Sequence, residues 1–464
     1  MTELALAGRV VELVREWAGP HAEAEVGVHH SALALTRFAN SAIHQNVDST
    51  VTTVSLRLHL DGRTAGGSTT VVDADGLRSL VDRTVAAARL SPPDTGWAGL
   101  LAPTPLSHPD TGFDEATAQA TPEDRALRVR EFVRAADGLE TAGFCRTHRA
   151  SAAFANSAGQ AVAGRAVEAA MDGIARADGA DGVARLAASR LADLDGAALG
   201  RRAAGKALAG RHPVELPPGQ YEVVLEPTAV ADLLANLASF AFNGRDSAQG
   251  RSFVELGAAQ FDPAVTIVDD PVGTFPGAAA TLPFDDEGTP RAPLTLVRDG
   301  VSTAVTHDRT SAAAAGATST GHASPSSRST GPTATHLRLL PGPAPTGPAG
   351  APDGPAVPSA RPLVAAMARG LLVTDLWYTR VLDQKSLAIT GLTRNGVWLV
   401  EDGEVVAAVS NMRFTQSYRQ ALAAGTVRGI GAEAVPLPDR WAGHQYAAPA
   451  LHLAGWNLTG NASG

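Results

Sequence analysis

The stretch VLEPTAVADLLANLASFAFNG, residues 224–244, predicts a β-strand that runs directly into an amphipathic helix. Pro227 fits the first helical position, because the N–H that it lacks would have no helical partner there. Four apolar residues then recur at helical spacing and predict a stripe that packs on a core: Val230, Leu233, Leu234 and Leu237. The helix carries no histidine and no cysteine, so packing is its expected role.

The size and composition of the chain predict a globular protein of more than one domain. Its 464 residues exceed what one hydrophobic core usually fills, and 44% of them are apolar. The net charge of −9 lacks the basic surplus that phosphate binding needs, so direct nucleic-acid binding is not expected. Cys145 is the single cysteine, which excludes an intrachain disulfide and fits a cytoplasmic protein. No apolar run is long enough to span a membrane.

The first part of the chain, residues 1–210, predicts an α+β domain of helices and antiparallel hairpins. Its helices are expected at residues 2–18, from Asp75, after the capping sequence TPED at 121–124, and at 195–210. TVSLRLHL at 53–60 alternates strictly and predicts a strand with one solvated face that turns back at Asp61-Gly62. A second hairpin is expected to turn at residues 156–159.

A proline-rich stretch at residues 209–219 predicts the boundary to a second domain at 219–464. This domain is expected to be mostly antiparallel β-sheet with packed helices. Its short strands include residues 264–271, 293–300 and 301–308, and TQSYRQALAAG at 415–425 predicts a helix. Two low-complexity segments, at about 311–334 and 341–362, are expected to be flexible loops beside a binding cleft.

Several motifs of the second domain, in this order, resemble the TldD/PmbA family, which is labelled as modulators of DNA gyrase and regarded as peptidases. They are GRSF at 250–253, VDDPVG at 268–273, PFDDEGTP at 283–290, STGHA at 319–323 and GLLVTDLWYTRVLDQKSLAITGLTRNGVWLVEDGEVV at 370–406. Residues 37–70 also resemble the first domain of the family. The resemblance therefore covers most of the chain.

The resemblance implies that active members hold zinc with HExxxH on the helix after a strand, together with a cysteine near the C-terminus. Here Ala235 and Phe240 stand at the histidine positions, Asn236 stands at the glutamate position, and no cysteine follows Arg428. Such side chains neither bind zinc nor activate its water. The chain therefore resembles the TldE (PmbA) kind, which lacks the motif and pairs with TldD.

This resemblance predicts a subunit without a cofactor of its own that pairs with a zinc-containing, TldD-like metallopeptidase and helps to enclose unfolded or modified peptides. Two alternatives stay open. One is a hydrolase with another site, built from Asp285 and Glu287 or from zinc on His444 and His452. The other is a peptide-binding scaffold without a peptidase partner. Self-association of the chain alone also stays open.

Candidate peptide or partner contacts are His307, His322, Asp285, Glu287, Leu337 and Leu339. Asp285 and Glu287 lie in a Gly- and Pro-containing segment that favours a solvated acidic turn over an acid–base pair. His307 and His322 fit hydrogen-bonded loop histidines better than ligands. THLRLLPG at 335–342 is the hypothetical sheet edge on which an extended peptide could add a strand. Cys145, three residues before His148 in a strand, is expected to be buried rather than nucleophilic.

Overall fold

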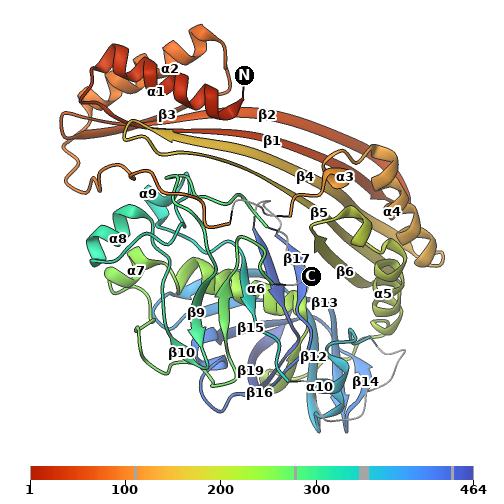
Figure 1. The fold of residues 1–464 in the computed structure, drawn as a ribbon. Helices are drawn as coiled ribbons and strands as arrows, with labels where there is room; N and C mark the ends of the chain where they lie inside the picture. The colour runs from red at the N-terminus through yellow and green to blue at the C-terminus, as the bar shows by residue number, and fades with distance from the viewer. Residues whose placement is uncertain (1, 109–111, 276–279, 344–354, 440–443, 463–464) are drawn as a thin grey trace.

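The computed structural model describes residues 2–108, 112–275, 280–343, 355–439 and 444–462. The first domain is one antiparallel sheet of six strands in the order β3-β2-β1-β4-β5-β6. Its strands are β1 (Glu23–Ala39), β2 (Ala42–Leu60), β3 (Arg63–Thr69), β4 (Glu140–Asn156), β5 (Ala161–Ala177) and β6 (Ala180–Ala188). Four of them exceed 15 residues, so the sheet forms a long arch over the rest of the molecule (Figure 1).

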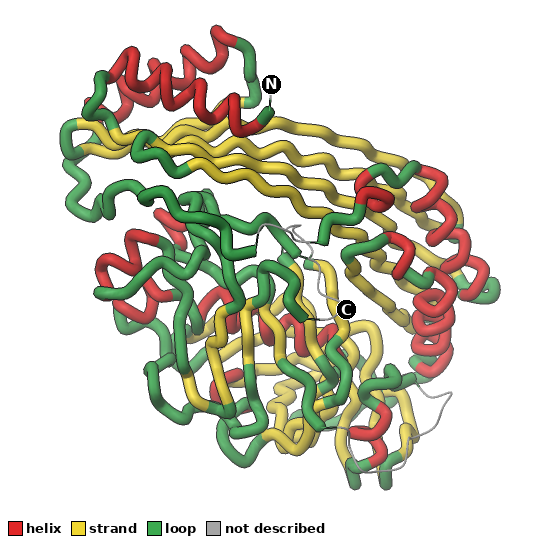
Figure 2. Tube along the Cα trace, viewed as in Figure 1, coloured by secondary structure: helices red, strands yellow, loops and turns green. Residues whose placement is uncertain are grey.

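Helices cover the two ends of the outer face of this arch (Figure 2). They are α1 (Glu3–Ala18), α2 (Ala74–Leu90), α3 (Glu115–Ala118), α4 (Pro122–Ala135) and α5 (Gly196–Ala209), with a 3-10 turn at Leu191–Asp193. One core joins α1 and α2 to the apolar residues of β1 and β2, such as Val28 and Val54. A second core joins α4 and α5 to β4 and β5 at the other end, around Phe132 and Met171.

Local turn and cap chemistry explains these boundaries. Asp61 and Gly62 both have positive φ angles, 49° and 74°, as a two-residue hairpin turn requires. Thr121 and Asp124 form the expected capping box at the start of α4, with Pro122 as its first residue. The second hairpin turns between Asn156 and Ala161. These sequence predictions are confirmed.

The second domain contains two mixed, mostly antiparallel sheets with α6 (Pro227–Phe240) between them, in contact with β12 of one sheet and with β11 and β18 of the other. The first sheet has the order β12-β7-β19-β15-β13-β14, with β16 paired to β19, and the second has the order β10-β9-β8-β11-β18-β17. The strands of the first sheet are β7 (Gly219–Leu225), β12 (Arg369–Asp383), β13 (Ala388–Glu401), β14 (Glu404–Ala408), β15 (Met412–Ser417), β16 (Val427–Ile430) and β19 (Leu451–Asn461). Those of the second are β8 (Ile267–Asp269), β9 (Leu294–Arg298), β10 (Val301–Ser302), β11 (Leu337–Leu339), β17 (Val435–Pro438) and β18 (Gln445–Ala448).

The remaining helices of the second domain are short: α7 (Gly244–Ala248), α8 (Arg309–Ala315), α9 (Ser327–Thr330), α10 (Arg361–Ala365) and α11 (Tyr418–Ala421). The predicted helix at 415–425 is therefore wrong over most of its length, because residues 415–417 belong to β15 and α11 covers only Tyr418–Ala421. The segment 311–334 includes most of α8 and all of α9 and buries His322 and Ala323, so it is not structureless. Residues 344–354 of the other predicted loop lie outside the described residues. No described helix is long and apolar enough to cross a membrane.

The structure of the first domain differs from the sequence predictions in two respects. The pattern at 53–60 covers only the last eight of the 19 residues of β2, and the partner strand β1 was not predicted. Moreover, the face of β2 that carries Arg57 and His59, predicted to be solvated, is half-buried at this end. Trp97 stacks on His59 with ring centroids 4.8 Å apart, and the second domain covers Arg57.

Candidate functional site: a cleft between the arch and the central helix

A cleft of about 570 Å³ lies between one face of α6 and the inner face of the arch. Six residues of α6 line it at helical spacing: Thr228, Ala231, Asp232, Ala235, Asn236 and Ser239. The arch contributes Phe144, Asp172 and Arg185, and the second domain adds Asp375, Leu376, Tyr378, Thr379, Leu437, Pro438, Asp439, His444 and Tyr446. Two of the three positions that the resemblance aligns with HExxxH, Ala235 and Asn236, therefore face this cleft.

The opposite face of α6 forms the core of the second domain. Val230, Leu233, Leu234 and Leu237 are at most 1% exposed and join the largest apolar cluster of the molecule. Phe240, the third aligned position, packs partly buried against the same cluster. The predicted apolar stripe is thus confirmed, and it fixes which face of the helix points into the cleft.

Asp232 organises the polar groups of the cleft floor. Its carboxylate accepts hydrogen bonds from Thr379 Oγ1 at 2.8 Å, from Asn236 Nδ2 at 3.1 Å and from the Tyr418 hydroxyl at 3.3 Å. Burial, and then the charge of Asp232, raise the pKa of Tyr418 well above its usual value. Asn236 also donates to the backbone oxygen of Asp232 at 2.9 Å. The side chain at the aligned glutamate position is therefore an amide held by its own helix.

Among the described residues that line the cleft, four are aspartates and one is an arginine. Arg185 lies between Asp172 at 2.8 Å and Asp375 at 2.9 Å, while Asp232 and Asp439 also line the cavity. Burial alone would lower the pKa of Arg185, but Asp375 and Asp172 reverse that effect and raise it. The arginine thus stays charged and fixes the wall of the cleft.

A buried ion pair attaches the start of α6 to the first domain. Lys206 of α5 contacts Glu226, the residue before Pro227, and both side chains are at most 3% exposed. The other carboxylate oxygen of Glu226 accepts a hydrogen bond from the backbone N–H of Val357 at 2.8 Å. Burial lowers the pKa of Lys206, and Glu226 opposes that shift. This pair holds α6 in place relative to the arch.

The candidate carboxyls Asp285 and Glu287 lie outside the cleft lining, at a second contact between the domains. Asp285 accepts hydrogen bonds from the backbone N–H groups of Glu287, Thr289 and Ala323, each at 2.9 Å. Burial, followed by the charge of Glu287, raises the pKa of Asp285 to about 7. The segment is the predicted turn, but the prediction that it is solvated is wrong, since both residues are buried.

Glu287 belongs to a buried ion cluster, which we define as Glu25, Arg57, Glu287 and Arg309. Arg57 contacts Glu287 at 2.8 Å and Glu25 at 3.3 Å, while Arg309 contacts Glu25 at 2.7 Å and donates its backbone N–H to Glu287 at 2.8 Å. No sequence pattern assigned Glu25, Arg57 or Arg309 to a shared cluster. A signal existed for the first two, because they are direct neighbours on β1 and β2. This cluster joins the arch to the second domain.

The histidine candidates are also part of the interior. His322 contacts Asp269 through Nε2 at 3.0 Å and Thr320 through Nδ1 at 2.8 Å. His307 contacts Ser311 at 3.2 Å. Both histidines are buried and neither lines the cleft, so the interpretation as hydrogen-bonded loop histidines is confirmed.

The sheet-edge hypothesis for residues 335–342 is wrong. β11 lies inside its sheet, antiparallel to β8 on one side and parallel to β18 on the other. Leu337 and Leu339 are 0% and 2% exposed. A peptide therefore finds no free edge there, and these two leucines do not present a contact surface.

The alternative zinc ligands do not come together in one site. His452 contacts Glu222 at 2.6 Å, whereas His444 lies at the cleft, 3.6 Å from Asp439. Within the part of the chain that the structure describes, no three His, Cys, Asp or Glu side chains form a group that could hold a metal ion. Cys145 is buried, and burial raises the pKa of its thiol to about 12. His148 contacts Ser31 instead, at 2.9 Å.

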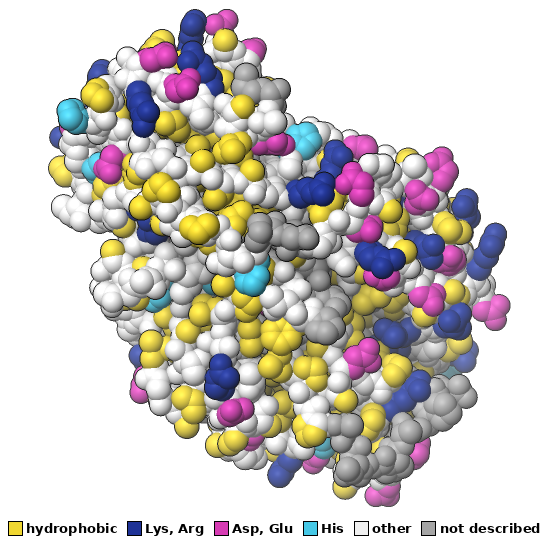
Figure 3. All heavy atoms as spheres, in the orientation of Figure 1, with side chains coloured by type: hydrophobic (Ala, Val, Ile, Leu, Met, Phe, Trp, Pro, Cys, Tyr) yellow, Lys and Arg dark blue, Asp and Glu magenta, His cyan; other side chains and the backbone are white. Residues whose placement is uncertain are grey.

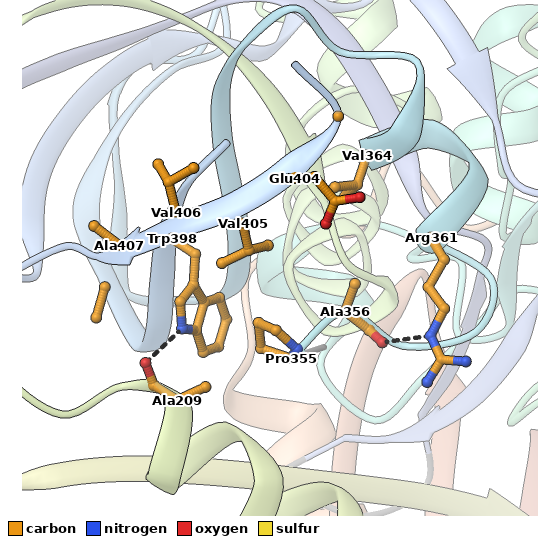
Figure 4. Close-up of a pocket in the computed structure, with 12 residues that line it drawn as sticks. Ala209, Pro355, Ala356, Arg361, Val364, Trp398, Glu404, Val405, Val406 and Ala407 are labelled. Atoms are coloured by element: carbon orange, nitrogen blue, oxygen red, sulfur yellow. Dashed lines mark hydrogen bonds between the residues drawn. The ribbon is translucent and has the colours of Figure 1, made fainter. Parts of the chain in front are cut away.

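A smaller cavity of about 250 Å³ lies where the end of α5 meets β13, β14 and α10. Figure 4 shows Trp398 and Val405 on one side and Pro355 on the other, with the indole N–H of Trp398 donating to Ala209 at 3.3 Å. Glu404 and Arg361 are the ionisable residues of its lining. The cavity thus offers a mainly apolar surface and no pair of carboxyls for acid–base chemistry.

Two family models match this chain. The model of the PmbA/TldA metallopeptidase C-terminal domain matches residues 218–460, and the model of domain 1 of the same metallopeptidases matches residues 24–88. The chain belongs to the PmbA/TldD family. The PmbA/TldD C-terminal match alone spans more than half of the sequence, and it includes α6 and the second-domain wall of the cleft.

Solved structures share the fold over almost the whole chain. TldE from Thermococcus kodakarensis is 18% identical, with a TM-score of 0.83 over 98% of this chain and 100% of its own. A protein from Thermotoga maritima whose name links it to modulation of DNA gyrase is 18% identical, with a TM-score of 0.81 over 99% and 100%. A similarly named protein from Bacteroides thetaiotaomicron is 18% identical, with a TM-score of 0.80 over 98% of each chain. No curated protein matches the chain significantly.

Proposed function

We propose that the chain is a zinc-free subunit of a TldD/TldE-type metallopeptidase complex in the cytoplasm. A TldD-like subunit supplies the zinc and the cleavage chemistry, and this chain helps to enclose unfolded or modified peptides. The observation that carries the proposal is the position of Ala235 and Asn236, which line the interdomain cleft from the helix that aligns with the HExxxH helix implied by the resemblance. A methyl group and a tethered amide provide no zinc ligand and no general base.

The form of the cleft supports a role in holding peptide. Its volume accommodates several residues of an extended chain, and the hydroxyl groups of Thr228, Ser239 and Tyr378 line it. The hydrolase alternative has less support. Asp285 and Glu287 are buried and bonded within the chain, and His452 is bonded to Glu222.

A reconstitution experiment tests this proposal. The chain, a TldD-like subunit with HExxxH, and the two together are each assayed for cleavage of an unfolded peptide. We expect little cleavage by this chain, and an increase when both subunits are present. If this chain binds peptide alone and leaves cleavage unchanged, it is a scaffold and the proposal fails.

A variant in the cleft tests whether the gain in peptide cleavage depends on this cavity. Ser239→Trp places a large ring in the cleft from an exposed position of α6, and it is expected to reduce the gain in cleavage at least about tenfold because peptide is excluded. Leu208→Trp, on exposed surface of α5 outside the cleft lining, is the matched control and should retain the gain. If both variants gave the same gain in cleavage, the cleft would not be required for the proposed function.

A further inference from the structure

The arch has a long strand edge that no other element covers. β3 pairs with β2 only over residues 54–60, so β2 is the rim of the sheet from residue 45 to residue 53. Within the described residues, no backbone or side-chain group bonds to the outer side of this segment. In Figure 1 it forms the upper rim between α1 and α2 at one end and α4 at the other. We call residues 45–53 the free edge.

The free edge is largely exposed, its pairing with β1 is regular from residue 45 to residue 53, and Asp48 is its one charged residue. Its sequence, QNVDSTVTT, is rich in β-branched residues and contains no proline, lysine or arginine. Natural edge strands normally carry such residues, a bulge or a covering element. β14, for comparison, has a register shift opposite Leu399 and Val400, and its end is bridged by Val214.

The hairpin geometry identifies which backbone groups of the free edge point outward. Leu60 and Arg63 close a two-residue turn, so Leu60 exchanges its backbone hydrogen bonds with β3. In an antiparallel sheet every second residue faces the same neighbour. Residues 58, 56 and 54 therefore also face β3, and Thr52, Thr50, Asp48 and Asn46 present their N–H and C=O groups to the empty side.

We propose that the free edge pairs antiparallel with the same segment of a second copy of this chain, about a two-fold axis at Ser49. This register sets the outward-facing Asp48 opposite Thr50 and Asn46 opposite Thr52, so that each pair can exchange two hydrogen bonds. A register shifted by one residue would place the outward-pointing N–H and C=O groups of one copy opposite residues of the other copy whose groups point back to β1. An axis at Asp48 would set two like charges opposite each other, which is destabilising.

Apolar contacts continue across the same junction. Val51 is 43% exposed, and Val47 lies beside it on the inner face of the arch. An axis at Ser49 sets Val47 of each copy opposite Val51 of the other. Leu35 and Leu33, the neighbours of Val47 and Ser49 on β1, extend this surface inward. The hydrogen-bond and apolar patterns of the free edge are thus both self-complementary in this register, and Asp48 does not lie directly opposite its own copy.

Thr50→Pro tests the pairing, because the Thr50 N–H faces outward and its loss leaves the β1–β2 hydrogen bonds intact. By light scattering, we expect wild-type protein at about twice the chain mass of 47.5 kDa, and the variant at the chain mass. Thr50→Val is the matched control and should stay dimeric. The proposal would be overturned if wild-type protein at a concentration of about 100 μM had the mass of a single chain. A Thr50→Pro protein that stays dimeric would also overturn it.

Charge variants test the register and do not depend on a proline being tolerated. Thr50→Lys puts a lysine opposite Asp48 twice and should lower the dimer Kd by roughly fivefold. Adding Asp48→Lys sets lysine opposite lysine and should raise the Kd above that of wild type. Ser49→Cys should form an intermolecular disulfide across the axis, whereas Val51→Cys should not. Equal cross-linking by both cysteine variants would contradict the register.

The second copy is one of two related occupants that the experiment distinguishes. If the isolated chain is monomeric and Thr50→Pro instead abolishes binding of a TldD-like subunit, the edge belongs to that subunit and the proposal is wrong. This result is separate from the peptidase assay, because the dimer of the chain alone does not require the proposed function.

Discussion

Two charged regions lie between the arch and the second domain, and they differ in how their charges are matched. In the buried ion cluster, two carboxylates face two guanidinium groups at 2.7–3.3 Å. In the cleft, four aspartates line about 570 Å³ of open space around Arg185. The ion cluster is a contact between domains, whereas the four aspartates and Arg185 line a cavity that a ligand could enter. Figure 3 shows the surface over both domains in the orientation of Figure 1.

The largest expected effect comes from breaking the ion cluster. Arg309→Ala leaves Glu25 buried with Arg57 as its remaining partner, and it should lower the free energy of unfolding by about 3–5 kcal/mol. Arg165→Ala, which breaks an exposed pair with Glu115, should cost at most about 1 kcal/mol. Urea denaturation measures both. Similar losses would mean that the cluster does not hold the domains together.

The two faces of α6 provide the second test. Leu234→Ala removes buried side-chain volume and should cost about 2–5 kcal/mol. Ser239→Ala on the cleft face should change stability by no more than about 0.5 kcal/mol. Thermal and urea unfolding of the two variants provide the comparison. A costly Ser239→Ala would indicate that the cleft face is structural and would weaken its assignment as a binding surface.

The third test is a pH dependence of the ion cluster. Burial raises the pKa of Glu25 from 4.5 to about 7, although Arg57 and Arg309 act in the opposite direction. The folded state then holds the proton more tightly than the unfolded state, so stability should decrease as the pH rises from about 4.5 to 7. Glu25→Gln removes this group and should flatten the decrease, while exposed Glu12→Gln should not. The midpoints of urea unfolding at several pH values measure this dependence. If the midpoints of both variants decreased equally with pH, Glu25 would not be the cause of the decrease.

Elements set by neighbouring residues were predictable from the sequence. The strand and helix at 219–240, the Asp61-Gly62 turn and the capping box at Thr121 depend on local periodicity, turn and cap chemistry. The resemblance also indicated the three positions of α6 that align with HExxxH, and the structure places two of them, Ala235 and Asn236, in the cleft.

Features that depend on distant pairing were not predictable. Glu25 and Arg309 are 284 positions apart, so no local pattern indicates their contact. The central position of β11 follows from which strands flank it, and the sequence of residues 335–342 does not specify them. Asp285 is polar and lies in a turn, yet it is buried in a segment that contacts the arch through the neighbouring Phe284 and Gly288.

The central claim is that α6 occupies the place of a zinc-binding helix without its chemistry. Elemental analysis of the purified chain, with no partner subunit present, tests this most directly. The account predicts clearly substoichiometric zinc and no chelator-sensitive peptide cleavage. One zinc ion per chain, together with cleavage that a chelator abolishes, would contradict it.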